Sequence, residues 1–159
     1  MSAGQPGLVV DVPAWVDAMA RPDAVLASDD EKMALLIRLA AENVDHGTGG
    51  PFAAAVFEVE SGRLVAAGVN SVVRLGSCVL HAEVVAIVRA QRRVGSFTLH
   101  APTLPAHELV TSCDPCAMCL GATLYSGVKR VVAAESPKRK LSATTSRAGD
   151  AAAPRTWAH

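Results

Sequence analysis

Two cysteines three residues apart are the first residues of this chain that could do chemistry. They are Cys116 and Cys119 in the stretch SCDPCAMC, directly after Pro115. Proline suits the first position of a helix, so we expect both cysteines in a first helical turn and on one side of it. The positive end of a helix favours the thiolate form, and thiolates are good zinc ligands. The spacing therefore indicates a pair of zinc ligands.

A histidine and a glutamate two positions apart complete this pair. His81 and Glu83 lie in HAEVVAI, where a long loop gives way to an apolar stretch. His81 and the two cysteines supply three protein ligands and leave the fourth tetrahedral position open, which is typical of catalytic zinc. Two thiolates neutralise the charge of the ion, so a base is needed to collect the proton of a zinc-activated water. We expect Glu83 to be that base.

Simpler interpretations of the same residues stay open. A closed structural zinc site would use Cys113 or Cys78 as its fourth ligand. Glu83 by itself is typical of a first-turn glutamate that stabilises the helix dipole. No role is expected for the remaining histidines, which we expect in loops or at the terminus: His46, His100, His107 and His159.

The elements that must position these residues follow from hydrophobic spacing and capping signals. Ser28 and Glu31 form a capping box for a helix that ends at His46 and Gly47. A strand, helix, strand order around CAMCLGATLYS implies a parallel pair with a right-handed crossover, which brings two helix N-termini together at the carboxyl ends of the strands. We expect a three-layer α/β fold, a mixed sheet with helices on both faces. The expected helices are 13–20, 29–45, 82–94 and 116–126, the expected strands 52–59, 64–70, 108–112 and 129–134, and the expected loop 71–80.

The length and composition of the chain predict one domain. Its 159 residues, 50% of them hydrophobic and 4% aromatic, are enough to bury a core without disulfides. We expect this domain over residues 1–135, with its core at 29–134. It carries ten basic and fourteen acidic residues, whereas residues 136–159 carry five basic and one acidic. That stretch lacks apolar periodicity, so we expect an irregular or disordered basic tail.

The expected cellular compartment and the number of cysteines both agree with a metal site. The N-terminal residues lack the basic start and the sustained apolar run of a secretory signal, and no uncharged apolar run approaches membrane-spanning length. The cytoplasm is therefore expected. Four cysteines in a reducing compartment indicate metal or catalytic work rather than a disulfide framework.

HAEVVAI followed by VTSCDPCAMCLGATLYSGVKRVV has the H-x-E…P-C-x-x-C order of zinc deaminases. The chain resembles the cytidine and deoxycytidylate deaminase superfamily over about residues 29–134. GGPFAAAVFE and VAAGVNSVV most resemble the bacterial guanine deaminases within it. The resemblance implies a cytidine deaminase-like fold, a homodimer, and zinc-dependent hydrolytic deamination of a free nucleobase. Guanine, converted to xanthine and ammonia, is the expected base, with triazines such as ammeline as further candidates.

Residue roles follow from this resemblance position by position. It implies that zinc is bound by His81, Cys116 and Cys119, and that Glu83 carries the proton. Asp114 stands where many relatives have glutamate. The positions that the resemblance assigns to the base pocket are Asn70, Pro51, Phe52, Ala82 and Asp114.

The C-terminal residues depart from this resemblance. Similar guanine deaminases continue with a Phe-Asp-Glu-Gly-Pro-like segment that closes the pocket, and residues 136–159 lack it, which leaves a shifted reading frame or a truncation as hypotheses. An unpaired sheet edge at this point would be a second reason to expect a dimer.

Three other functions stay open. The basic tail would suit a tRNA adenosine deaminase, a cytosine deaminase is the other enzymatic alternative, and an inactive, zinc-stabilised dimerisation module is an alternative of another class. The acidic body and the single short KRK run disfavour a nucleic-acid partner.

Overall fold

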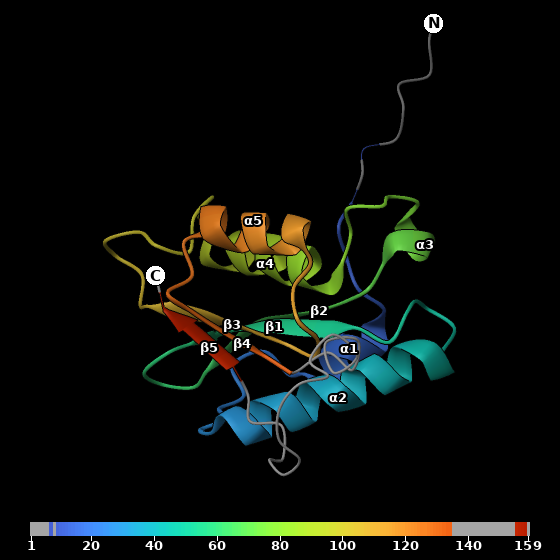
Figure 1. Cartoon of the computed structure of the whole chain (residues 1–159), viewed down its shortest axis with the longest axis horizontal. Helices are drawn as coiled ribbons and strands as arrows, with labels where there is room; N and C mark the ends of the chain where they lie inside the picture. Colours follow the sequence, from blue (N-terminus) through green and yellow to red (C-terminus); the bar gives the residue numbers. More distant parts are fainter. Residues whose placement is uncertain (1–6, 8, 135–154, 159) are drawn as a thin grey trace, which may run out of the picture.

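The computed structural model describes residues 7, 9–134 and 155–158 of the chain. A five-stranded sheet in the order β2-β1-β3-β4-β5 lies between two layers of helices (Figure 1). The strands are β1 (Ala53–Glu58), β2 (Leu64–Val69), β3 (His107–Thr111), β4 (Arg130–Ala133) and β5 (Arg155–Ala158). The helices are α1 (Ala14–Met19), α2 (Asp29–Asp45), α3 (Val72–Leu75), α4 (Ala82–Val94) and α5 (Ala117–Ser126). The predicted three-layer α/β fold is confirmed.

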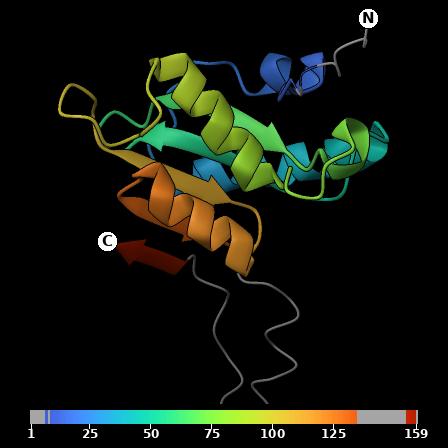
Figure 2. The ribbon, with the colours of Figure 1, turned by 90° about the horizontal axis from the view of Figure 1, so that it is seen from above.

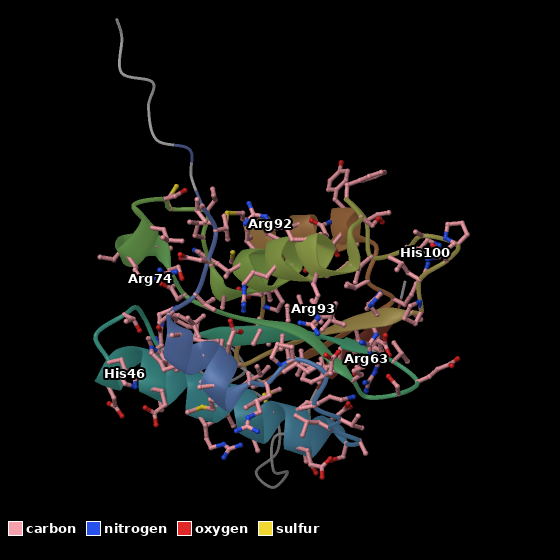
Figure 3. All side chains as sticks on the ribbon, turned by 180° about the vertical axis from the view of Figure 1, so that it is seen from behind. His46, Arg63, Arg74, Arg92, Arg93 and His100 are labelled. Atoms are coloured by element: carbon pink, nitrogen blue, oxygen red, sulfur yellow. The ribbon has the colours of Figure 1, made fainter. Side chains whose placement is uncertain are left out.

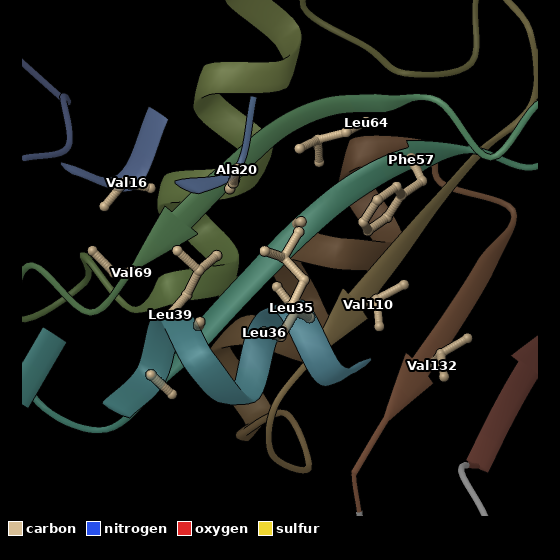
Figure 4. Close-up of a cluster of buried hydrophobic side chains, with 14 residues drawn as sticks. Val16, Ala20, Leu35, Leu36, Leu39, Phe57, Leu64, Val69, Val110 and Val132 are labelled. Carbon is tan, nitrogen blue, oxygen red and sulfur yellow. The ribbon is translucent and has the colours of Figure 1, made fainter. Parts of the chain in front are cut away.

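Helices α1 and α2 cover one face of the sheet, and α4 and α5 lie side by side on the other (Figure 2). The interior strand β1, between β2 and β3, is buried along its whole length. Its residues Ala53, Ala55 and Phe57 belong to the cluster under α1 and α2, which Figure 4 shows between α2 and the sheet. Ala54 and Val56 pack on the α4 side. An unbroken apolar run suits a strand that is covered on both faces.

The start of α2 follows directly from its sequence. The Ser28 hydroxyl accepts a hydrogen bond from the Glu31 N–H at 3.2 Å, and the Glu31 carboxylate accepts from the Ser28 N–H at 3.1 Å. This reciprocal pair is the predicted capping box. It fixes the first turn of the longest helix, which carries the core residues of one sheet face.

The strand directions determine where the chemistry can lie. Strands β2 and β3 each run antiparallel to β1, so they are parallel to each other, and β3 is also parallel to β4. The carboxyl ends of β2 and β3 therefore lie at the same end of the sheet. The β3–α5–β4 unit is the predicted parallel crossover. The residues just after β2 and β3, Asn70 and Ser112, thus share that end with the start of α4.

Two local expectations are corrected. The expected loop 71–80 contains the short helix α3, which ends at Gly76 in the left-handed conformation (φ 65°). Helix α5 begins at Ala117 with Cys116 as its N-cap, so Pro115 lies before the helix and does not occupy its first position. Hydrophobic periodicity does not reveal α3, because a helix of four residues is too short to show it. The start of α5 differs from the predicted start by one residue.

The expectation of an irregular tail is wrong for residues 155–158. They form β5, which pairs antiparallel with β4 in register Arg130↔Ala158 to Ala133↔Arg155. Strand β4 is therefore not an unpaired edge. An unpaired edge at β4 is thus no longer a reason to expect a dimer. The remaining tail, 136–154 and 159, lies outside the described residues, as does any consequence of the frame-shift hypothesis. None of the described helices has the length and apolar character that crossing a membrane requires.

Candidate metal centre and base pocket

Three side chains with metal-binding atoms meet where α4 and α5 begin. His81 is the N-cap of α4, Cys116 is the N-cap of α5, and Cys119 lies in the first turn of α5. The His81 Nδ1 atom is 3.7 Å from the Cys116 Sγ and 3.5 Å from the Cys119 Sγ. All three ligand atoms lie within 4.8 Å of one another. Two crossover helices that start at one end of the sheet thus bring together residues separated by more than thirty positions in the sequence.

These distances fit a tetrahedral zinc ion. Zn–N bonds of about 2.05 Å and Zn–S bonds of about 2.3 Å, at the tetrahedral angle, separate the nitrogen and sulfur by about 3.6 Å. Within the described part of the chain no further His, Cys, Asp or Glu joins this group. Cys78 is exposed outside it, and Cys113 lines the neighbouring pocket without being a member. The donor set therefore leaves one position open, as a catalytic zinc site requires.

The surroundings of Cys119 change the pKa of its thiol. Burial raises the pKa of the Cys119 thiol, and the nearby Glu83 carboxylate raises it further. A thiol in such surroundings carries no negative charge by itself, whereas a coordinated metal ion deprotonates it outright. Metal binding at Cys119 would therefore release a proton from its thiol.

A pocket of about 220 Å³ opens beside the three ligand atoms. Glu83 is only 6% exposed and lies in its wall, so a carboxylate is held at the edge of the metal site with little competing water. The pocket is lined by Phe52, Asn70, His81, Glu83, Cys113, Asp114 and Cys116. The site therefore combines a set of side chains that could hold a metal, a buried carboxyl group, an aromatic ring and an amide.

Most positions expected from the sequence meet in this pocket. Pro51, Ala82 and Cys119 are not among its lining residues. Pro51 is exposed two residues before β1, whereas Ala82 and Cys119 are buried at the starts of α4 and α5. Sequence reasoning missed Cys113 as a lining residue, although its place directly before Asp114 could have indicated it.

The remaining histidines lie away from the pocket, but one expectation about them is wrong. His107 is not in a loop: it is a fully buried residue of β3 whose Nδ1 lies 2.9 Å from the Leu99 carbonyl oxygen. The His46 ring stacks on Trp15 with ring centroids 5.1 Å apart. His100 is exposed, and His159 lies outside the described residues.

Besides Arg89, which donates to Asp17, four arginines on the back of the molecule hold the N-terminal segment, residues 9–27, in place (Figure 3). Each donates a hydrogen bond to this segment, where Asp23 accepts from two of them, Asp11 from a third and the Val10 carbonyl from the fourth. The donors are Arg63, Arg74, Arg92 and Arg93 (Figure 3). Because these guanidinium groups are used within the chain, they do not constitute a free basic surface for a nucleic acid.

Comparison with known proteins agrees with this site. The model of the cytidine and deoxycytidylate deaminase zinc-binding region matches residues 27–135. A guanine deaminase of Bacillus subtilis is 40% identical over 95 residues, which are 60% of this chain and 56% of that enzyme. The chain thus spans little more than half the length of this curated relative.

Two solved structures share the fold closely. The guanine deaminase of Nitrosomonas europaea is 40% identical with a TM-score of 0.78, over 85% of this chain and 74% of that one. A mutant protein in complex with 8-azaguanine is 39% identical with a TM-score of 0.79, over 86% of this chain and 75% of that one. Together with the family match over most of its length, these findings show that the chain belongs to the family defined by the cytidine and deoxycytidylate deaminase zinc-binding region, whose metal is zinc.

Proposed function

We propose that this protein is a zinc-dependent aminohydrolase that converts guanine and water to xanthine and ammonia. The observation that carries the proposal is the meeting of His81, Cys116 and Cys119 at a pocket that also contains the buried carboxylate of Glu83. Similarity to guanine deaminases and to a structure with bound 8-azaguanine supports guanine among the bases.

The pocket itself favours a small substrate. Its volume of about 220 Å³ lies below the roughly 300–1,000 Å³ of pockets that enclose drug-sized ligands. A flat base can stack on the Phe52 ring, and the Asn70 amide offers both a donor and an acceptor to the edge of that base. Triazines such as ammeline have a similar size and shape and are secondary candidates.

Each residue of the site has a distinct task in this reaction. His81, Cys116 and Cys119 would hold the zinc ion, which supplies a Lewis acid that makes water a nucleophile at neutral pH. Glu83 accepts one proton from the attacking water and passes it to a ring nitrogen, and it then carries the proton of the new hydroxyl group to the amine, which leaves as ammonia. The Glu83 carboxylate ends each cycle ionised, so the net change is the exchange of an amino group for an oxygen.

A homodimer belongs to the same proposal. Helix α5 buries only Cys119, Thr123 and Ser126. Its outer side carries apolar or aromatic side chains that are between 37% and 92% exposed: Met118, Leu120, Leu124 and Tyr125. An exposed apolar helix face of this kind is typical of an association surface, and we propose a second copy of the chain as its partner. We also propose a cytoplasmic location, because two zinc-binding thiolates need reducing surroundings.

The decisive experiment measures ammonia release by the zinc-loaded chain from guanine, ammeline, cytosine, adenosine and an adenosine-bearing tRNA stem-loop. We expect release from guanine. The Glu83→Gln variant should keep its zinc and lose about 10²–10⁴-fold in kcat. Glu58→Gln is the matched control, because Glu58 is buried to a similar degree, 8% exposed, and lies outside the pocket.

The alternatives predict different outcomes in the same assay. Bound zinc without ammonia release from any compound would select the inactive dimerisation module. Release from the stem-loop alone would select a tRNA adenosine deaminase, and release from cytosine alone a cytosine deaminase. Full turnover by the Glu83→Gln variant would refute the assigned proton carrier.

A further inference from the structure

Asn43, near the end of α2, lies beneath the base pocket without lining it. Its side chain is completely buried. The Nδ2 group donates to the carbonyl oxygens of Gly50 at 2.8 Å and Asn70 at 3.0 Å. The Oδ1 atom accepts from the Thr48 hydroxyl at 2.8 Å. The side chain therefore connects two chain segments that are twenty residues apart in the sequence.

The chemistry of these partners leaves the amide one orientation. Backbone carbonyl oxygens only accept hydrogen bonds, so both must face the NH₂ group, whose two protons they use. The Thr48 hydroxyl satisfies the amide oxygen. The backbone carbonyl of Asn43 accepts in addition from the N–H groups of Thr48 at 3.0 Å and Gly49 at 3.1 Å. A buried polar side chain with every bond made is a rigid link.

The two segments held by Asn43 carry two walls of the pocket. Gly50 precedes Pro51 and Phe52, and the Asn70 N–H donates to the Phe52 carbonyl at 3.0 Å. Phe52 and Asn70 both line the pocket, whereas Asn43 does not. The distance between the Phe52 ring and the Asn70 amide, which would both contact a bound base, therefore depends on the hydrogen bonds of the Asn43 side chain.

Gly49 provides independent evidence that this packing is close. A Cβ atom at this position would lie 2.0 Å from the Asn70 carbonyl oxygen and 2.6 Å from the Asn43 Nδ2. Both distances are far below van der Waals contact, and the first of these atoms belongs to the backbone. The turn therefore approaches Asn70 so closely that only glycine fits.

From these contacts we infer that Asn43 is a positioning residue for substrate: it holds Phe52 and Asn70 at the spacing that grips the base. The inference rests on the proposed function of the pocket. Loss of the Asn43 amide removes the donor to the Asn70 carbonyl and leaves the Gly50 carbonyl with the Phe52 N–H alone, and the turn must then move away from Asn70. The metal ligands lie on α4 and α5 and are not part of this bridge, so the binding of base is weakened while the chemical step is preserved.

The test compares Asn43→Asp and Gly49→Ala with Leu36→Ala in the zinc-loaded chain. Aspartate keeps the shape of Asn43 but donates to neither carbonyl, whereas Gly49→Ala places a Cβ atom against both Asn70 and the Asn43 amide and forces the turn apart with residue 43 unchanged. Leu36 is the matched control because it lies fully buried in the same helix and faces the core instead of the turn. We expect both test variants to raise KM for guanine about tenfold or more, with kcat within about threefold and zinc content unchanged.

The inference is overturned if both test variants keep a KM within about twofold of the unchanged chain, or if Leu36→Ala raises KM equally. The second result would mean that KM reports general destabilisation. If Asn43→Asp does not fold, Gly49→Ala alone decides.

A readout without turnover separates this inference from the proposed function. The Gly49 and Asn70 amides report by hydrogen exchange whether the turn stays packed against Asn70, since the first donates to the Asn43 backbone carbonyl and the second to the Phe52 carbonyl. Faster exchange confined to these amides in Asn43→Asp, and absent in Leu36→Ala, supports the positioning role. Uniform or unchanged exchange contradicts it. A chain that releases no ammonia from guanine refutes the proposed function, and the exchange measurement then decides the role of Asn43 by itself.

Discussion

Removing the charge of Lys32 should destabilise the fold far more than removing a lysine at the surface. Lys32 is 3% exposed and Glu108 is 1% exposed, with the Nζ and Oε1 atoms 2.6 Å apart. The ammonium also lies 5.4 Å from the centre of the Phe57 ring. Arg130 donates to the second oxygen of Glu108 at 2.6 Å. The Lys32→Met variant keeps most of the side-chain volume but leaves Glu108 with one partner where it had two.

The expected magnitude follows from burial. Breaking a buried ion pair by removing one partner costs about 3–5 kcal/mol, and we expect about 3 kcal/mol because Arg130 still holds Glu108. For a domain of this length that corresponds to a fall in Tm of about 6–12 °C. Lys32→Met combined with Glu108→Met removes both charges, so the double variant should lose at most about 1 kcal/mol.

Urea unfolding of the two single variants and the double variant measures these values in one double-mutant cycle. Lys129→Met is the control, because Lys129 is exposed and should change the free energy of unfolding by less than about 0.5 kcal/mol. A Lys32→Met cost below about 1 kcal/mol, or a double variant whose cost equals the sum of the single costs, would refute this reasoning.

Three further predictions concern pH, metal and association. The hydrogen bond from Arg130 lowers the pKa of the Asp29 carboxyl group below its usual 3.8. The ionised carboxylate therefore stabilises the fold fully above pH 3.8, and this stabilisation is lost as the pH falls through the pKa of the folded state. The urea midpoint should therefore change less steeply between about pH 5 and about pH 2.5 in Asp29→Asn than in the unchanged chain. Cys116→Ser should lower the zinc content of the purified chain and its thermal midpoint together, and a variant that retains one equivalent of zinc by atomic absorption would contradict the ligand assignment. Leu124→Glu with Tyr125→Ser should convert a dimer to a monomer in sedimentation, whereas an unchanged mass would exclude this face of α5 as the interface.

Much of this fold could be predicted from the sequence because its signals are local. The capping box at Ser28 and Glu31 needs only three residues of spacing and correctly predicted the start of α2. The unbroken apolar run of β1 predicted a strand covered on both faces. The His-x-Glu and Cys-x-x-Cys spacings predicted the metal-ligand set, since each pair occupies one helix start, and the crossover rule predicted that these two starts meet.

What the sequence could not determine depends on contacts between distant residues. Strand β5 has no apolar alternation of its own and exists because β4 offers it an edge to pair with. The interior ion pair joins residues 76 positions apart, and neither Lys32 nor Glu108 carries a local sign that it is buried. Asn43 stands in a polar stretch near a helix end, and only the close approach of the glycine turn to Asn70 makes its amide a bridge. Local propensity determined the elements and the metal ligands, whereas the shape of the pocket was decided by tertiary packing, because a hydrogen bond between distant segments forms only after the fold has brought them together.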